Sequence, residues 1–159
     1  MKKKVFLGAI FISAVFLGVY LTNHSFFLVK PLPAPSSIVS TTTTIISING
    51  KTYILEIADT ALERQQGLSN RQALPQEHGL LFVFEDEGQY GFWMKDMNFP
   101  IDIIWLDKNK KIVFIKENVV PESYPQSYSN KVPALYVLET NVGFVKEHNL
   151  KIGDIMNIK

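Results

Sequence analysis

The stretch GFWMKDMNFPIDIIWLD, residues 91–107, decides the fold, because it places two tryptophans and four charged side chains among apolar neighbours. Side chains alternate across a strand, so parity assigns each residue of its second half to one face. Asp102 shares a face with Ile104 and Leu106, while Ile103 and Trp105 point the other way. The stretch therefore predicts a strand that holds one acid, Asp102, among aliphatic side chains.

A buried carboxylate without a partner costs several kcal/mol, so Asp102 requires either a cation or several amide donors. Two interpretations remain open. In the first, an ion pair fixes a helix and its following loop to the sheet. In the second, the same groups form a pocket for an anionic or sugar-like ligand, with an aromatic wall and a few charges. The candidate ligand-binding residues are Arg64, Arg71, Trp93, Lys95 and Asp102.

A second candidate site lies in the loop VVPESYPQSYSNK, residues 119–131, which contains Tyr124 and Tyr128. Aromatic residues in an exposed loop can meet sugars or partner proteins, although surface packing explains them equally well. The two prolines of this loop oppose sheet pairing, so no strand is expected there.

Turn and cap signals outside the central stretch indicate a hairpin and a short helix. The runs IISI (45–48) and KTYILEIA (51–58) flank Asn49-Gly50, the pair that most readily takes positive φ in a type I′ turn. Thr60 and Glu63 have the spacing of a capping box, and Gly67 follows as a helix end. We expect a β-hairpin followed by one short helix.

Further apolar runs complete the expected elements. Strands are expected at 80–84, with a return into 89–96, then at 101–107, 111–118, 133–139 and 154–158, and a second short helix at about 142–148. Eight strands and two short helices favour a mainly β fold, either a compact eight-stranded β-sandwich or a partly closed barrel.

The N-terminus predicts export to a membrane. Three lysines precede the apolar run Val5–Leu21, which as a helix would be about 26 Å long, slightly less than a bilayer core. No small-residue cleavage triplet follows closely, which favours an uncleaved anchor over a removed signal. We expect a signal anchor at 1–30, a Pro/Ser/Thr-rich linker at 31–44 and an extracytoplasmic β domain at 45–159 on the outer side of the membrane.

The composition excludes several kinds of functional site and partner. The chain has no cysteine, which excludes disulfides, thiol nucleophiles and a lipoprotein cysteine. After residue 30 there are 12 basic and 15 acidic residues, a net charge of −3, which argues against nucleic acid as a partner. The three histidines lie far apart, and no phosphate loop or nucleophile elbow is present, so we predict neither a metal nor a cofactor. A pair of acids for glycoside cleavage among Asp96, Asp102 and Asp107 stays open.

The order of several motifs carries a family resemblance. ERQQGLSNR (63–71), GLLFVF (79–84), GFWMKDMNFPIDIIWLD (91–107) and YVLETNVGF (136–144) follow one another over about residues 52–154. This part of the chain resembles the family known as domain of unknown function 192, small bacterial and archaeal proteins that are often exported. The resemblance implies a β-sandwich with short helices, but it implies no catalytic residues. Relatives often have Asn-Thr after the motif lysine and a cysteine in the later loop, and this chain has neither.

The predicted function is a membrane-tethered binding or accessory module for a small polar, sugar-like or anionic ligand of the cell envelope. A hydrolase or lyase acting on envelope carbohydrate, with Asp102 and Asp96 as acid and base, is the first alternative. The second is a structural interaction domain, which would present an exposed apolar patch instead of a hollow.

Overall fold

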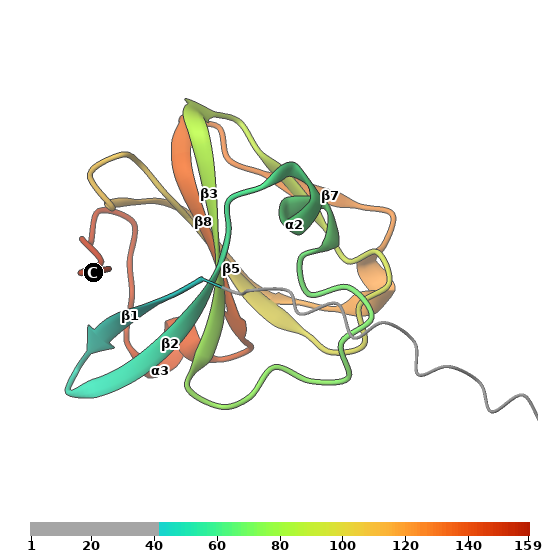
Figure 1. Ribbon diagram of the computed structural model, residues 1–159, viewed down its shortest axis with the longest axis horizontal. Coiled ribbons are helices and arrows are strands. Elements are labelled where there is room, and N and C mark those ends of the chain that lie inside the picture. The colour runs from blue at the N-terminus through green and yellow to red at the C-terminus, as the bar shows by residue number, and fades with distance from the viewer. Residues whose placement is uncertain (1–41) are drawn as a thin grey trace, which may run out of the picture. The chain divides into compact units, whose positions relative to one another are not determined.

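The computed structural model describes residues 42–159, which form a mainly β domain with eight strands and two short α-helices (Figure 1). The elements in chain order are β1 (Thr43–Ile48), β2 (Lys51–Ala58), α2 (Ala61–Gln66), β3 (His78–Gly88), β4 (Gly91–Trp93), β5 (Ile101–Leu106), β6 (Ile112–Val119), the 3₁₀ turn η1 (Pro121–Ser123), β7 (Ser127–Ser129), β8 (Ala134–Asn141) and α3 (Phe144–Glu147). The expected membrane segment lies outside the described residues. Within residues 42–159, no helix has the length and apolar character needed to cross a bilayer.

Six strands form one sheet in the order β1-β2-β3-β8-β5-β6, and β4 pairs with β7 in a separate two-stranded sheet. Neighbours in the large sheet are antiparallel except β2 and β3, which are parallel because α2 and a long loop return the chain before β3 begins. The large sheet is not closed into a barrel. Isolated bridges instead join the C-terminal segment to both edges of the sheet, from Ile158 to Ile46 of β1 and from Ile155 to Lys111, the residue before β6.

The predicted hairpin at Asn49-Gly50 is confirmed. Asn49 and Gly50 have φ of 51° and 80°, as a type I′ turn requires, and Ile48 pairs with Lys51 on either side. The β5–β6 hairpin is also present, with Leu106 paired to Ile112. Local turn chemistry therefore decides the connection between β1 and β2.

Replacing Gly50 with alanine should lower the free energy of unfolding by about 1 kcal/mol. Open space surrounds the position, so the loss comes from holding a residue with a Cβ at φ of +80°. Thermal unfolding measures the effect. Gly50→Asn should cost less, because asparagine tolerates this conformation, and equal losses for both variants would contradict the explanation.

The number of strands agrees with the expectation, but some of the strands are formed by other residues than expected. Residues 89–96 do not return onto β3, because β2 and β8 already occupy both sides of that strand, and β4 pairs with β7 instead. The loop expected to lack strands thus contains β7, whose residues 127–129 lie between its prolines and the next strand. Conversely, residues 154–158 make isolated bridges and no strand.

Each face of the large sheet carries an apolar cluster. The first cluster lies under α3 and the C-terminal segment and includes Ile104 and Leu138. The second lies on the opposite face and includes Ile103 and Trp105. The predicted parity of β5 is therefore confirmed, and Asp102 belongs to the face of the first cluster. In Figure 1, α2 and β7 lie to one side of the sheet and the C-terminus to the other.

Helix α2 lies above the second cluster but contributes no buried residue to it. The predicted capping box is present, since Thr60 accepts from the Glu63 amide and the Glu63 carboxylate accepts from the Thr60 amide. Leu68 and Leu74, which follow the helix, are buried in the second cluster and fix the loop to the sheet. This arrangement leaves space between the helix and the sheet.

Candidate functional site

Asp102 is fully buried and accepts hydrogen bonds from three backbone amides. Its Oδ1 accepts from Asn118 N at 2.9 Å, and its Oδ2 accepts from Gly143 N at 3.1 Å and Val145 N at 3.0 Å. The expectation of several amide donors is confirmed. The alternative of a cation, and with it the interpretation as an ion pair, is wrong, because the ion pairs among residues 42–159 do not include Asp102. Asp102 fixes the α3 turn and the end of β6 to the sheet.

The same geometry excludes Asp102 and Asp96 from acting together as a catalytic acid and base. Asp102 is 0% exposed with both oxygens occupied, whereas Asp96 lies in an exposed turn with φ of 57°. The two carboxylates therefore do not share a cleft.

Arg71 lies on the opposite face of the sheet and pairs with Glu56 of β2. Its two terminal nitrogens donate to the two carboxylate oxygens of Glu56 at 2.7 and 2.8 Å. These hydrogen bonds lower the pKa of Glu56 and raise the pKa of Arg71, with burial opposing both shifts. The charge of Arg71 is thus matched by a protein carboxylate.

Glu139 of β8 is the acid that lies beneath α2. In the sheet register, Glu56 is opposite Leu80 and Leu80 is opposite Glu139, so the two acids lie on the same face, two strands apart. Glu139 is 5% exposed, and no side-chain hydrogen bond or ion pair among the described residues involves its carboxyl. Burial raises the pKa of Glu139 to about 8, and the positive charge of Arg71 offsets only part of that rise. At pH 7 the carboxyl is mainly neutral and can both donate and accept a hydrogen bond.

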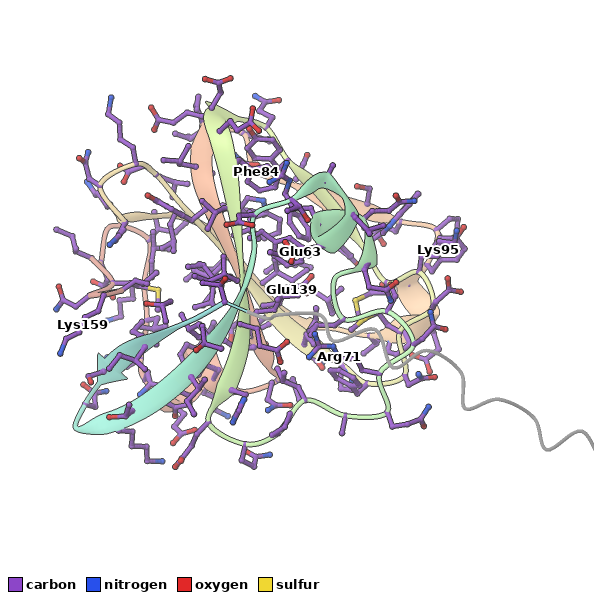
Figure 2. All side chains as sticks on the ribbon, viewed as in Figure 1. Glu63, Arg71, Phe84, Lys95, Glu139 and Lys159 are labelled. Carbon is purple, nitrogen blue, oxygen red and sulfur yellow. The ribbon has the colours of Figure 1, made fainter. Side chains whose placement is uncertain are left out.

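Glu139 borders a hollow of about 170 Å³, which we call the Glu139 hollow. Its wall is largely aromatic and its rim carries uncharged polar groups; the lining includes Arg64, Gln66, Ser69, Phe82, Tyr90 and Trp93. Figure 2 shows Glu139 between the sheet and α2, in keeping with its small exposure. Two predicted site residues, Arg64 and Trp93, therefore meet here.

The position of Arg64 is fixed by contacts with the sheet. Its guanidinium donates to the carbonyl of Val83 at 2.9 Å and to that of Asp59, and it lies 5.4 Å from the centre of the Phe84 ring. Phe84 in turn stacks on Tyr90 with an interplanar angle of 7°. This stack forms one wall of the hollow.

A second hollow, of about 480 Å³, lies on the other side of the α2 helix end, and we call it the Arg71 hollow. Both hollows touch Gln66, Gly67 and Ser69. Most of the surface that lines the Arg71 hollow is apolar and includes Ala58, Leu62 and Leu80. Besides the Glu56–Arg71 pair, its polar lining includes Thr60, Glu63 and Asn70. The sequence-predicted Arg71 thus lies in the space adjoining the one that holds Arg64 and Trp93.

Lys95 and the two loop tyrosines have different surroundings. Lys95 is exposed and lines neither hollow; Figure 2 shows it at the periphery. Tyr124 is 45% exposed and contacts Trp93 edge to face, with ring centres 5.9 Å apart. Tyr128 is half-buried opposite Phe92, with the Lys116 ammonium 5.2 Å from its ring centre. The structure therefore brings Tyr124 to the edge of the candidate site.

Within residues 42–159, no cluster of three potential metal ligands is present.

The sequence reasoning missed Glu139, and a signal was available. Glu139 follows YVL in β8 and shares the parity of Val137, which belongs to the second cluster. The argument that singled out Asp102 in β5 applies to this strand without change. A buried acid at position 139 was therefore predictable from residues 134–141.

Comparisons with known proteins identify the same family as the order of the sequence motifs. The family model of DUF192, described as an uncharacterized ACR, matches residues 44–158. UPF0127 proteins of Thermococcus kodakarensis and Thermococcus gammatolerans are each 30% identical over 105 residues, which are 65% of this chain. The matched region spans 63% and 65% of the length of these relatives.

Two solved structures share the fold. One, from Sinorhizobium meliloti 1021, is described as a proposed transcription regulator; it has a TM-score of 0.65 and 32% identity, over 73% of this chain and 91% of that one. The other, from Novosphingobium aromaticivorans, is described as a protein of unknown function; it has a TM-score of 0.66 and 26% identity, over 79% of this chain and 91% of that one. The resemblance of the sequence is confirmed, and the chain belongs to the DUF192 family.

Proposed function

We propose that this domain is a binding module that takes a small, uncharged, hydroxyl-bearing ligand, such as one sugar ring, into the Glu139 hollow. The observation that carries the proposal is the carboxyl of Glu139, which is buried at an aromatic-lined hollow without a side-chain partner among the described residues. Among the described residues the fully buried side-chain atom without a hydrogen-bond partner is Thr140 Oγ1, so the Glu139 carboxyl reaches the hollow, where a ligand group can bond to it. A ligand hydroxyl can supply both a donor and an acceptor to it.

The surroundings favour a neutral ligand over an anion. Arg71 is already paired with Glu56, and Arg64 donates to two backbone carbonyls, so neither cation is free to neutralise a ligand charge. The remaining polar groups around the hollow include Gln65, Gln66 and Ser69, which are uncharged. Aromatic walls combined with neutral polar groups suit the mixed apolar and hydroxyl surface of a sugar.

We further propose that residues 1–30 tether the domain to the outer side of the membrane. The basis is the order of charged and apolar residues at the N-terminus. A reporter fused at Lys159 should be active only outside the cytoplasm, and a cytoplasmic signal would contradict the proposal.

Carbohydrate hydrolysis is a second candidate function, favoured by the opposite protonation of two acids on one face. Glu139 is mainly neutral at pH 7 and Glu56 is ionised, which are the states of a proton donor and a proton acceptor. In that reaction, water adds to the anomeric carbon and gives a proton to Glu56, while Glu139 protonates the departing oxygen. The two acids line different hollows, however, so binding is better supported than cleavage.

A protein-binding role has one observation in its favour. Leu62 is 76% exposed at the apolar Arg71 hollow, as an interaction domain would require. A regulator of transcription, as the Sinorhizobium protein is described, would need a basic surface, and the negative balance of residues after 30 does not support one here.

Thermal melting against a panel of monosaccharides, anions and metal ions tests the proposed function. A ligand present at 100 times its Kd stabilises by about 2.7 kcal/mol, which for a domain of this size raises Tm by several degrees. We expect a neutral sugar to raise Tm and inorganic phosphate and sulfate to have no effect.

Two variants identify the hollow as the site. Glu139→Gln retains a donor and an acceptor and should keep the Tm shift, whereas Glu139→Leu should abolish it. Glu87→Gln, at an exposed ion pair with Lys108, is the control and should behave as the original protein. A panel without any Tm shift, or a shift that survives Glu139→Leu, would contradict the proposal.

A further inference from the structure

We infer that Trp93 and Tyr124 form a second sugar subsite at the rim of the Glu139 hollow, so that the ligand is a chain of at least two linked sugar units. This inference rests on the proposed function, because it assigns the first unit to the hollow. It adds a surface that binding of a single ring would not use.

The two aromatic side chains are unusually exposed for their size. Trp93 is 56% exposed and Tyr124 is 45% exposed, whereas the other tryptophan, Trp105, is completely buried. Their rings are 5.9 Å apart at an angle of 66°, which makes a corner with two apolar walls. Large planar side chains left in water in this way typically belong to interaction sites.

The backbone that carries Trp93 is firmly anchored. Its neighbour Phe92 packs edge to face on Phe82 and on Trp105, with ring centres 4.8 and 5.8 Å apart. Met94 is 1% exposed on the other side, and Trp93 itself pairs with Ser127 of β7. The backbone that carries the exposed ring is therefore held in place before any ligand arrives, which reduces the entropy lost on binding.

The rim is continuous with the hollow, because Trp93 lines the hollow as well as contacting Tyr124. A volume of about 170 Å³ is smaller than the roughly 300–1,000 Å³ of pockets that hold drug-sized ligands. One ring therefore fills the hollow, and a linked second unit can leave past Trp93. The apolar face of a sugar ring can stack there while its hydroxyls remain in water.

The charges near the rim do not favour a charged ligand. Arg64 and Arg71 are satisfied within the domain, and Lys95 lines neither hollow. Ser127 of β7, which pairs with Trp93, adds another uncharged polar residue beside the rim. A neutral glycan chain therefore fits this surface better than an acidic or basic peptide.

Binding of the full-length protein to N-acetylglucosamine and glucose, each as the monomer and as the β-1,4-linked trimer, tests the inference by isothermal titration. The trimer of the recognised sugar should bind about tenfold more tightly than its monomer. Tyr124→Ala, at a residue that does not line the hollow, should remove most of that gain and change monomer binding less than twofold. Tyr124→Phe, which keeps the ring, is the matched control and should retain the full gain.

Tryptophan emission gives a second readout. Trp105 is buried, so a blue shift on adding the trimer reports Trp93, and Trp93→Phe should abolish the shift. Equal affinity for monomer and trimer, or a Tyr124→Ala loss that is the same for both, would overturn the second subsite and leave the proposed function intact. Absence of binding by every sugar in both lengths would overturn both. Tyr124→Ala should keep the original Tm, because Tyr124 is 45% exposed, and this separates loss of binding from unfolding.

Discussion

The Glu139→Gln variant should be more stable than the original protein at pH 9 and of similar stability near pH 4.5. The pKa of Glu139 is raised from 4.5 to about 8 in the folded protein, so the folded state holds a proton that the unfolded state releases. Stability from this group is complete below about pH 4.5, declines as pH rises toward 8 and is constant above it. At 1.36 kcal/mol per pH unit, the loss is on the order of 5 kcal/mol at most.

Urea unfolding at several pH values, followed by the emission of buried Trp105, measures the difference between the two proteins. Glutamine has the shape of the protonated acid but cannot ionise, so its curve should lack the decline between pH 4.5 and 8. Glu56→Gln is a control with the opposite sign, because the pKa of Glu56 is lowered and its contribution is lost on acidification. Parallel curves for the original protein and Glu139→Gln would show that the acid is not buried as described.

A glutamate that costs stability at alkaline pH suggests a role other than folding. Replacing such a group by a neutral residue commonly stabilises a protein at the expense of its function. Glu139 fits that pattern, since its position beneath α2 has no compensating cation within hydrogen-bonding distance among the described residues. We therefore expect Glu139→Leu to be more stable than the original protein and to lose ligand binding.

The sequence predicted local structure correctly where a single short segment determines the backbone geometry. Asn49-Gly50 and the Thr60–Glu63 capping box act within four residues, and both are present as predicted. The alternation of β5 was also predictable, because a buried strand must sort its side chains between two faces.

Strand pairing between distant segments was not predictable in the same way. β7 is only three residues long and has no apolar alternation of its own, since its side chains are Ser127, Tyr128 and Ser129. It becomes a strand because β4 presents unpaired backbone groups to it, a fact of the tertiary structure. For the same reason the predicted return of residues 89–96 onto β3 was wrong.

The candidate site was predicted in part. Arg64, Arg71 and Trp93 line the two hollows, but Asp102, around which they were grouped, lies on the other face. The error arose because the partners of a buried acid were sought among cations. Every residue except proline has a backbone amide, so the sequence does not indicate which amides will face a given carboxylate. The three donors to Asp102 could therefore not be identified before the fold was known.

Asp102→Ala should destabilise the protein by about 3–5 kcal/mol. Removing the carboxylate leaves the amides of Asn118, Gly143 and Val145 without their acceptor at a site that is 0% exposed. Each unsatisfied buried donor costs about 1–3 kcal/mol, and not all of that cost is recovered by local relaxation. Because the amides belong to α3 and to the end of β6, hydrogen exchange should accelerate first in those two segments.

Asp107→Ala is the matched control, since Asp107 also accepts two backbone amides, from Asn109 at 2.8 Å and Lys111 at 3.0 Å. Those amides lie in an exposed turn, where water replaces the carboxylate, so the loss should stay under about 1 kcal/mol. Urea unfolding of both variants measures the contrast. Similar losses for Asp102→Ala and Asp107→Ala would mean that water reaches the Asp102 site, and the account of a buried acid held by backbone amides would then be wrong.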